Sequence, residues 1–204
     1  SDSLPNVLWV SFEDCLPHFG CYGDSVATTP NVDALASQGC IYPNAFSSAP
    51  ICAPARAGVI TGMYPPSIGA HHMRISQARP DIPIRPKQYD APTQHFVKCL
   101  GEYFRREGYY CSNNVKADYQ FTPPFAAWDD WSYGAHWRNR PDPDMPFFSV
   151  FNPEYTHESG MWEDMRSRPV MVEPEPAFEA ITDPDAVEVP PYFPDTPRVR
   201  RSIA

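Results

Sequence analysis

Apolar residues along the chain gather in short runs whose spacing suits the strands of a buried sheet. The run at 6–12 is apolar without clean alternation, which predicts a strand that is buried on both faces, as in parallel sheets. A second strand is expected at 41–46, where Pro43 would place it at a sheet edge or a bulge. Two further strands are expected at 109–115 and 147–151.

Helices are expected in the segments between these strands. The segment 29–39 offers a threonine for the N-cap, a proline in the first turn and a glycine at its end, and Val32 with Leu35 would face the sheet. The segment 52–62 again has an early proline and a final glycine, and 92–107 repeats Phe or Leu at every fourth position. This alternation of strands and helices predicts an α/β fold, with a mainly parallel sheet flanked by helices.

Composition narrows the class of protein. Apolar residues make up 42% of the 204 residues and aromatic residues 14%, enough for one domain with a hydrophobic core. A net charge of -9 argues against a nucleic-acid or anionic-membrane binder, no run approaches the roughly 20 apolar residues of a membrane span, and no signal peptide is recognisable. The 26 prolines are densest after residue 140. We expect one domain over 1–166 and an extended, proline- and acid-rich arm of the same domain over 167–204.

Cys52 is the cysteine with the most informative surroundings. The six cysteines are too few for a disulfide scaffold at this length, and they form no CxxC pair, so a structural zinc site is not expected either. One interpretation of Cys52 is a small, buried residue near the start of a helix, which is a common place for cysteine. The other is an activated thiol, because a helix N-terminus and Arg56 one turn later would both favour the thiolate. The residues alone leave both interpretations open.

Cys52 also begins a longer motif. Residues 52–62 match the pattern C-x-P-x-R-A-x-x-x-T-G, which resembles the signature of the type I formylglycine-dependent sulfatases in the alkaline-phosphatase-like superfamily. The segments 6–14, 21–23 and 28–36 are similar to the opening of that family and occur in the same order. Weaker similarities follow at 108–110, Lys116, 147–148 and His157.

Membership of this family implies a hydrolase of sulfate esters, with a sulfated carbohydrate as the expected substrate. A maturation enzyme would oxidise Cys52 to formylglycine (3-oxoalanine), whose aldehyde hydrates to a geminal diol. One diol oxygen, assisted by bound Ca²⁺ and by Arg56, would attack the sulfur and expel the alcohol. The second hydroxyl then lets sulfate leave, which an ordinary serine ester would not allow. The family is exported (periplasmic or secreted) or lysosomal, so we expect the same here.

The resemblance implies roles for individual residues. Cys52 would supply the nucleophile and contact the metal, with Arg56 as its orienting partner. Glu13 and Asp14 match the first two calcium-binding acids, although the family usually has Asp at both positions. The other interpretation of this pair is a solvated strand end. Lys116 would contact the sulfate group, unless it is simply an exposed lysine.

Four more residues are candidates for the same pocket. His157 matches a family histidine that can donate a proton to the leaving oxygen. Asp118 stands where the family usually has a histidine, and we expect it to bind a hydroxyl or amine of the substrate. His72 and Arg74 follow the signature helix and would also bind substrate. A cluster of basic residues starts at Arg74. It would either steer an anionic sugar towards the site or pair with the acid-rich arm at 167–204.

Part of the family's site has no counterpart in this sequence. The later calcium ligands and a second lysine are missing, so the chain resembles an N-terminal portion whose partner would be the remaining C-terminal part of the sulfatase. We expect these 204 residues alone to bind calcium weakly and to turn over little or nothing. Two alternatives stay open: a phosphonate or phosphodiester hydrolase that uses the same aldehyde, and a non-catalytic fragment that binds sulfated glycans.

Overall fold

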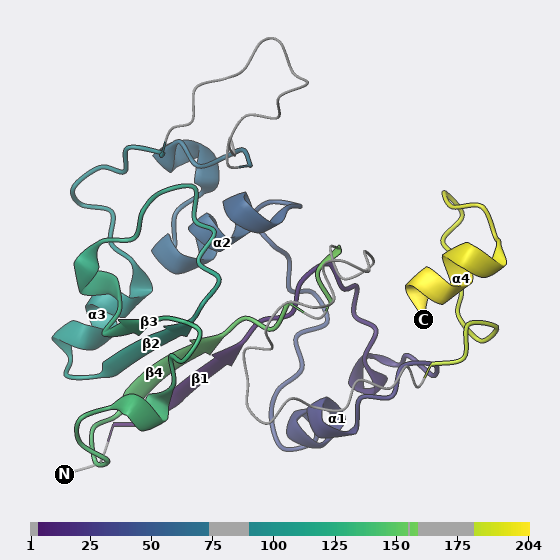
Figure 1. Cartoon of the computed structure of the whole chain (residues 1–204), viewed down its shortest axis with the longest axis horizontal. Helices are drawn as coiled ribbons and strands as arrows, with labels where there is room; N and C mark the ends of the chain where they lie inside the picture. Colours follow the sequence, from purple (N-terminus) through teal and green to yellow (C-terminus); the bar gives the residue numbers. More distant parts are fainter. Residues whose placement is uncertain (1–3, 74–89, 155, 159–181) are drawn as a thin grey trace. The chain divides into compact units, whose positions relative to one another are not determined.

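A computed structural model describes residues 4–73, 90–154, 156–158 and 182–204. The chain divides into two compact units (Figure 1). Unit 1 combines residues 1–11 with 46–153, and unit 2 combines residues 12–45 with 154–204. The β-sheet belongs to unit 1.

The sheet of unit 1 has four parallel strands in the order β1–β4–β2–β3. Its strands are β1 (Val7–Val10), β2 (Tyr110–Asn114), β3 (Asp130–Trp131) and β4 (Phe147–Phe151). Phe148 of β4 is paired with Val7 on one side and with Cys111 on the other. The parallel sheet confirms the predicted α/β fold and the strands expected at 109–115 and 147–151, whereas the short β3 was not predicted.

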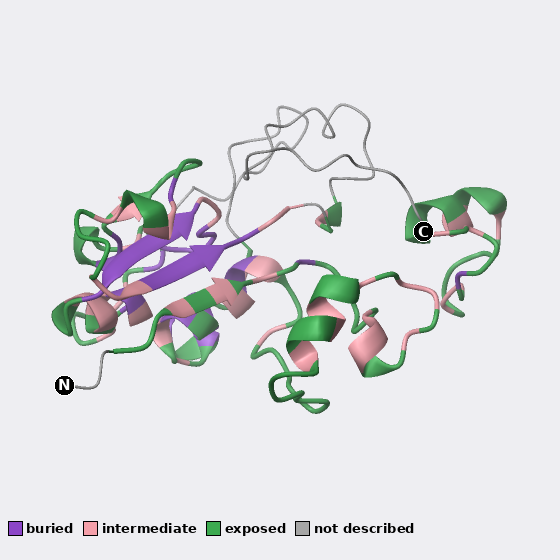
Figure 2. Ribbon diagram, turned by 90° about the horizontal axis from the view of Figure 1, so that it is seen from below, coloured by how far each residue is buried: buried purple, intermediate pink, exposed green. Residues whose placement is uncertain are grey.

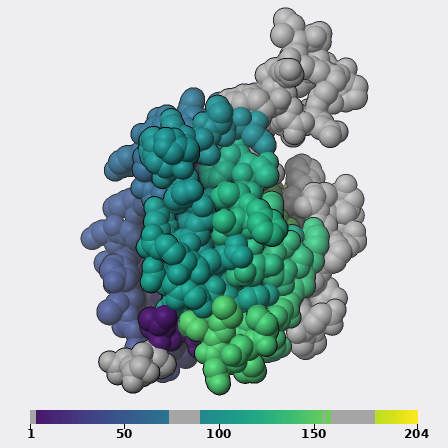
Figure 3. Space-filling model, turned by 90° about the vertical axis from the view of Figure 1, so that its left-hand side faces the viewer, coloured from purple at the N-terminus to yellow at the C-terminus, as the bar shows by residue number. Residues whose placement is uncertain are grey.

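The core of unit 1 lies where α3 (Leu100–Arg106) packs against the sheet. Phe148 is fully buried, and its ring stacks on Phe104 at a centroid distance of 4.5 Å and on Trp128 at 5.8 Å. Burying one such side chain contributes about 1.5–3 kcal/mol to stability. Figure 2 shows the buried residues concentrated along the inner strands. In Figure 3 the segments that carry α3, β2 and β4 join in one continuous face.

The helix predicted at 52–62 is confirmed as α2 (Cys52–Thr61). It ends at Gly62, whose φ of 67° lies in the left-handed region that glycine tolerates. An added Cβ at Gly58 would collide with Oγ of Ser48, so only glycine fits there without a shift. The buried face of α2 consists of Ala53, Pro54, Ala57, Gly58 and Ile60. These mostly small residues let the helix approach its neighbours closely, which holds its first turn in place.

Two of the predicted strands differ from the structure. β1 alternates in exposure, with Leu8 53% exposed and Val10 46% exposed, so the prediction that it is buried on both faces is wrong. It is the terminal strand of the described sheet, and only one of its faces contributes to the core. Residues 41–46 form no strand, because a turn occupies Pro43 and Asn44 and proline has no N–H to donate to a strand ladder.

The helix predicted at 92–107 is shorter than expected. α3 begins only after Cys99, whose backbone N–H donates to Oε2 of Glu102 at 2.8 Å in a capping box. Phe96 lies before the helix and is 62% exposed, so it does not extend the apolar stripe. Gly108, just beyond the helix, has a φ of 87°, a left-handed conformation that suits glycine at a helix end.

Unit 2 contains η1 (Gly20–Tyr22), α1 (Pro30–Ala36) and α4 (Pro197–Ile203). α1 lies within the helix predicted at 29–39, and Leu35 on it is 73% exposed. The carboxylate of Asp33 accepts a hydrogen bond of 2.7 Å from the backbone N–H of Cys21, which ties η1 to α1.

Three short helices complete the described elements: η2 (Pro65–Ile68), η3 (Phe125–Ala127) and η4 (Trp137–Asn139). Of the arm predicted at 167–204, the structure describes 182–204, and this part carries α4. None of the helices within the described ranges is long and apolar enough to cross a membrane. All six cysteines are free thiols.

Candidate active site

Cys52 is the first residue of α2 and is half-buried. Its Sγ lies 3.7 Å from Sδ of Met73. Burial raises the pKa of the Cys52 thiol, and Asp118 raises it further through its charge and a hydrogen bond, while Lys116 opposes the increase. The raised pKa favours the thiol over the thiolate in the unmodified residue.

Lys116 and Asp118 belong to an irregular segment that follows β2. Residues 117–121 are all buried although they form neither helix nor strand. Asp118 and Gln120 both have a φ of 60°, a left-handed conformation that residues other than glycine rarely adopt. Such conformations cluster at functional sites, where the surrounding structure compensates for the strain. The same segment supplies both charged groups that act on the Cys52 thiol.

Arg56 lies one turn beyond Cys52 on α2. Its Nη1 donates to Oδ1 of Asn152 at 2.8 Å, and its Nη2 donates to Oγ of Ser11 at 3.3 Å. The Ser11 hydroxyl in turn donates to Oδ1 of Asn152 at 2.8 Å. Because Ser11 follows β1 and Asn152 follows β4, the guanidinium is bound by the residues just beyond two neighbouring strands.

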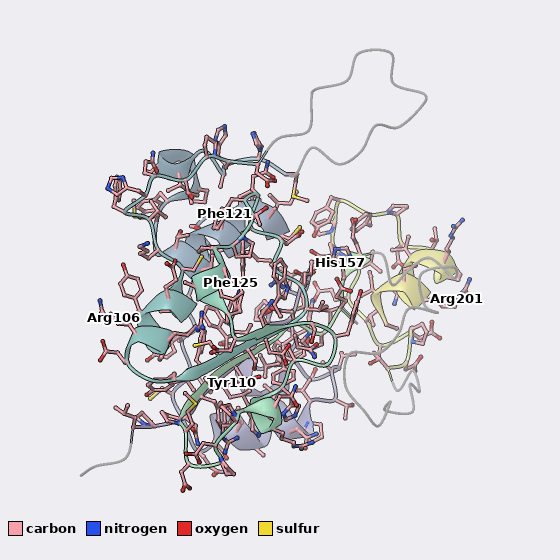
Figure 4. The ribbon with its side chains drawn as sticks, turned by 60° about the vertical axis from the view of Figure 1, so that its left-hand side comes forward. Arg106, Tyr110, Phe121, Phe125, His157 and Arg201 are labelled. Carbon is pink, nitrogen blue, oxygen red and sulfur yellow. The ribbon has the colours of Figure 1, made fainter. Side chains whose placement is uncertain are left out.

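A second group of predicted residues lies in unit 2. Glu13 is 7% exposed, and its Oε2 lies 3.7 Å from Nε2 of His157, which Figure 4 labels. The backbone N–H of Glu13 donates to Oγ1 of Thr156 at 3.0 Å, and Oδ2 of Asp14 accepts from the backbone N–H of Glu158 at 2.8 Å. The segment that follows β4 therefore holds the two acids that follow β1.

Glu13 and Asp14 offer carboxylate oxygens, the ligand type that calcium prefers. Within residues 4–73, 90–154, 156–158 and 182–204, no group of three or more His, Cys, Asp or Glu is arranged to hold a metal ion. The donor chemistry of the pair fits calcium, but two acids form only part of a ligand set of six to eight oxygens.

The predicted site residues thus fall into two groups. Unit 1 brings together Cys52, Arg56, Lys116 and Asp118, and unit 2 brings together Glu13, Asp14 and His157. His72 directly precedes Met73, the residue in contact with Cys52, and its ring lies 4.8 Å from that of His71. Arg74 lies outside the described residues.

Sequence reasoning missed Ser11 and Asn152, the two residues that bind the Arg56 guanidinium. A signal for both was present, because each is the first polar residue after an apolar strand. In parallel sheets, side chains at the carboxyl ends of strands are the usual place for ligands.

The parallel sheet with its flanking helices defines an α/β domain, and at the start of α2 it carries a cysteine and an arginine one turn apart. Solved structures share this fold. BT1596, a 2-O GAG sulfatase, matches 72% of this chain and 34% of that chain with a TM-score of 0.55 and 21% identity. BT4656, solved with its substrate D-glucosamine-2-N,6-O-disulfate, matches 76% of this chain and 35% of that chain with a TM-score of 0.58 and 17% identity.

Residues 5–163 match the model of the Sulfatase family, and the chain belongs to this family. An ulvan-active sulfatase of Formosa agariphila is 49% identical over 159 residues, which cover 78% of this chain and 26% of that protein. Human iduronate 2-sulfatase is 43% identical over 65 residues, which cover 32% of this chain and 12% of that protein. The chain therefore spans about a quarter or less of the length of these relatives.

Proposed function

We propose that this chain carries the nucleophile and the sulfate-binding cations of an enzyme that hydrolyses sulfate esters through a formylglycine formed from Cys52. The observation that carries the proposal is the group at the start of α2. There Arg56 follows Cys52 by one helical turn, and Lys116 and Asp118 act on the Cys52 thiol from the segment after β2, all within the range that matches the Sulfatase family. A formylglycine at residue 52 would supply a hydrated aldehyde oxygen as the nucleophile and would let sulfate leave afterwards.

The cations of unit 1 would bind and orient the anionic ester. Lys116 lowers the pKa of the Cys52 thiol, which supports our proposal that its ammonium would attract a sulfate group there. Arg56 lies one turn from residue 52 and is tied to Ser11 and Asn152, which keeps its guanidinium in one orientation. The half-burial of this position would strengthen both interactions relative to water. Asp118 would accept a hydrogen bond from a hydroxyl or amine of the substrate.

Glu13 and Asp14 would supply part of the ligand set of a calcium ion. When bound, the calcium would neutralise charge that builds up on the sulfate oxygens. His157 contacts Glu13, so in unit 2 its imidazole is placed to orient that carboxylate, and we propose that it also carries a proton for the leaving oxygen. The length of the relatives supports further ligands from a later part of a full-length sulfatase.

A sulfated carbohydrate is the substrate class that we propose. The relative with 49% identity is named for its activity on ulvan, and one structural neighbour was solved with a sulfated glucosamine as substrate. Both names are consistent with an anionic sugar as the substrate. Binding of such a sugar would require cations such as Lys116 and Arg56. We therefore propose a sulfate ester of a polysaccharide such as ulvan rather than an aryl sulfate as the natural substrate.

Peptide mass spectrometry on protein from its natural source tests the proposal. Conversion of the Cys52 side chain from CH₂SH to an aldehyde makes the tryptic peptide that ends at Arg56 roughly 18 Da lighter. Fragmentation must localise this loss to Cys52, because the peptide also contains Cys15, Cys21 and Cys40. The variant Cys52→Ala is the control, and it must abolish both the mass loss and hydrolysis of the sulfate ester. An intact Cys52 thiol in the natural protein would contradict the proposed nucleophile and favour a module that only binds sulfated glycans.

A paired activity assay separates the two kinds of tetrahedral ester. The full-length protein is tested with 4-nitrophenyl sulfate and with bis(4-nitrophenyl) phosphate under the same conditions. We expect higher kcat/KM for the sulfate. Preference for the phosphodiester would replace the sulfatase by a phosphodiester hydrolase that uses the same aldehyde.

A further inference from the structure

We propose that Asn152 is the positioning residue for Arg56. This inference rests on the proposed function, in which Arg56 binds the sulfate ester. The buried carboxamide of Asn152 would hold the guanidinium of that arginine in its orientation. Asn152 is not part of the sulfatase signature at 52–62 and lies nearly a hundred positions beyond it in the chain.

The carboxamide of Asn152 uses its full hydrogen-bonding capacity. Its Oδ1 accepts from Nη1 of Arg56 and from Oγ of Ser11, both at 2.8 Å. Its Nδ2 donates to Oδ1 of Asn113 at 3.0 Å and to the backbone carbonyl of Asn114 at 3.1 Å. An asparagine side chain has two acceptor sites and two donor hydrogens, and all four are used. The orientation of the amide is therefore determined by its partners, and the oxygen must face Arg56.

The backbone around Asn152 is also held on both sides. Its own N–H donates to the carbonyl of Asn114 at 3.2 Å, and the preceding carbonyl of Phe151 accepts from the N–H of Ser11 at 2.9 Å. Asn152 thus lies just beyond the strand that pairs with both β1 and β2. The residue is only 2% exposed, so no water competes for its oxygen. Because the backbone and the side chain of Asn152 are both held by hydrogen bonds, its Oδ1 is an acceptor at a defined position for the Arg56 guanidinium.

Only an asparagine at position 152 satisfies all of the hydrogen-bonding partners around it. An aspartate at this position would still accept from Arg56 and Ser11, but its second oxygen would face the carbonyl of Asn114, which can only accept. An alanine would leave Asn113 and Arg56 without these bonds. Asparagine therefore links Arg56 to β2 without adding a charge next to the cation that would bind the sulfate.

The first test follows the guanidinium directly by NMR. The full protein is labelled with ¹⁵N-arginine, and Arg56→Lys identifies the signals of Arg56. Hydrogen bonds to Asn152 and Ser11 slow rotation about Nε–Cζ, so Nη1 and Nη2 of Arg56 should give separate signals. We expect Asn152→Ala to merge them. Ser149→Ala is the matched control, because it removes a buried hydroxyl bond to Ser112 elsewhere on β4 and should leave both signals separate.

The second test separates positioning from a general loss of structure. With 4-nitrophenyl sulfate, Asn152→Ala should lower kcat by about 10- to 100-fold, the size expected for a misplaced binding group. In the double variant with Arg56→Ala, the loss should equal that of Arg56→Ala alone, because Asn152 acts only through the arginine. Ser11→Ala, which removes a smaller part of the network, should shift both readouts in the same direction but by less.

The outcomes that would overturn the inference are distinct from those that would overturn the proposed function. Separate Nη signals in Asn152→Ala, or losses that multiply in the double variant, would show that Asn152 does not position Arg56. A wild-type protein without activity on any sulfate ester would overturn the proposed function, and the NMR comparison would still decide the role of Asn152. If Asn152→Ala does not fold, Asn152→Ser, which keeps a polar group but is too short to bridge Arg56 and β2, provides the same comparison.

Discussion

The backbone N–H of Glu158 donates a hydrogen bond of 2.8 Å to Oδ2 of Asp14, across 144 positions of the chain. A second bond joins the N–H of Glu13 to Oγ1 of Thr156. The two carboxylates that would bind calcium are therefore oriented by the segment that also carries His157. Under the proposed function, this segment would determine where calcium binds as well as which proton donor lies nearby.

Replacement of Thr156 by valine tests this relationship. The variant Thr156→Val keeps the shape of the side chain but removes the acceptor for the Glu13 N–H, so this donor loses its partner. We expect the opening free energy measured by hydrogen exchange at the Glu13 amide to fall by about 0.5–1.5 kcal/mol. Thr122→Val, which removes an exposed bond to Asp90, is the control and should not affect Glu13. Unchanged exchange at Glu13 in Thr156→Val would show that this bond does not hold the acid pair.

Gly101 offers a test of the contact between α3 and η3. A Cβ at Gly101 would collide with the backbone carbonyl oxygen of Ala127, and backbone cannot move aside as a flexible side chain can. We expect Gly101→Ala to lower the free energy of unfolding by about 1–3 kcal/mol, measured by urea denaturation. Gly39→Ala is the matched control, because its Cβ would lie 3.5 Å from the carbonyl oxygen of Leu35, an ordinary contact. Equal stability of the two variants would mean that α3 is not as closely packed as the structure indicates.

Local sequence patterns predicted those strands and helices whose boundaries are determined by neighbouring residues. The strand at 147–151 and the helix that begins at Cys52 are present as expected, because an apolar run and a proline followed by a glycine determine them locally. The exposure of Leu8 on β1 could not be predicted, since the apolar run says nothing about which element covers each face. The strand expected at 41–46 failed because a proline turn outweighed the apolar pattern.

From residue spacing alone, without the family resemblance, the candidate site was predictable only where its residues share one motif. Cys52 and Arg56 are one helical turn apart, so the sequence alone brings them together. The partners of Arg56 could not be identified this way, because Ser11 and Asn152 are separated by 141 positions and meet only when β1 pairs with β4. The sequence also did not predict the raised pKa of the Cys52 thiol. This increase arises from burial and from Asp118, which lies in an irregular segment of the chain.

Asp24 provides a prediction for low pH. Hydrogen bonds from the backbone N–H of Ala27, from His18 and from the N–H of Val26 lower the pKa of the Asp24 carboxyl from 3.8 to about 2. Because the folded pKa lies below the unfolded value, the stabilising contribution is present above pH 3.8 and is lost as the pH falls through about 2. A ¹³C NMR titration of the Asp24 carboxyl should show a midpoint near 2.

His18→Ala should raise this midpoint only in part, because the largest contribution comes from the backbone bond of Ala27. Asp24→Asn should remove the loss of stability between pH 3.8 and about 2 that this carboxyl causes. A midpoint of 3.8 in the wild-type protein would show that these hydrogen bonds are not maintained in solution.

The thiol of Cys52 allows the charges of its surroundings to be measured before any modification takes place. In protein produced without the maturation enzyme, burial and Asp118 raise the pKa of Cys52, whereas Lys116 lowers it. Alkylation by iodoacetamide requires the thiolate, so the rate at a fixed pH reports this pKa. At pH 8.5 we expect Asp118→Asn to increase the rate by about 2- to 10-fold, since one pKa unit corresponds to a tenfold change in thiolate.

Lys116→Met should have the opposite effect and slow the alkylation of Cys52, because it removes the cation that favours the thiolate. Opposite signs in the two variants distinguish an electrostatic effect from local unfolding, which would accelerate alkylation in both. Mass spectrometry of the tryptic peptide that ends at Arg56 follows the reaction, with fragmentation to assign the label to Cys52. Acceleration in both variants, or no change in either, would mean that Lys116 and Asp118 do not act on residue 52, and the proposed binding of the sulfate ester by Lys116 would lose its support.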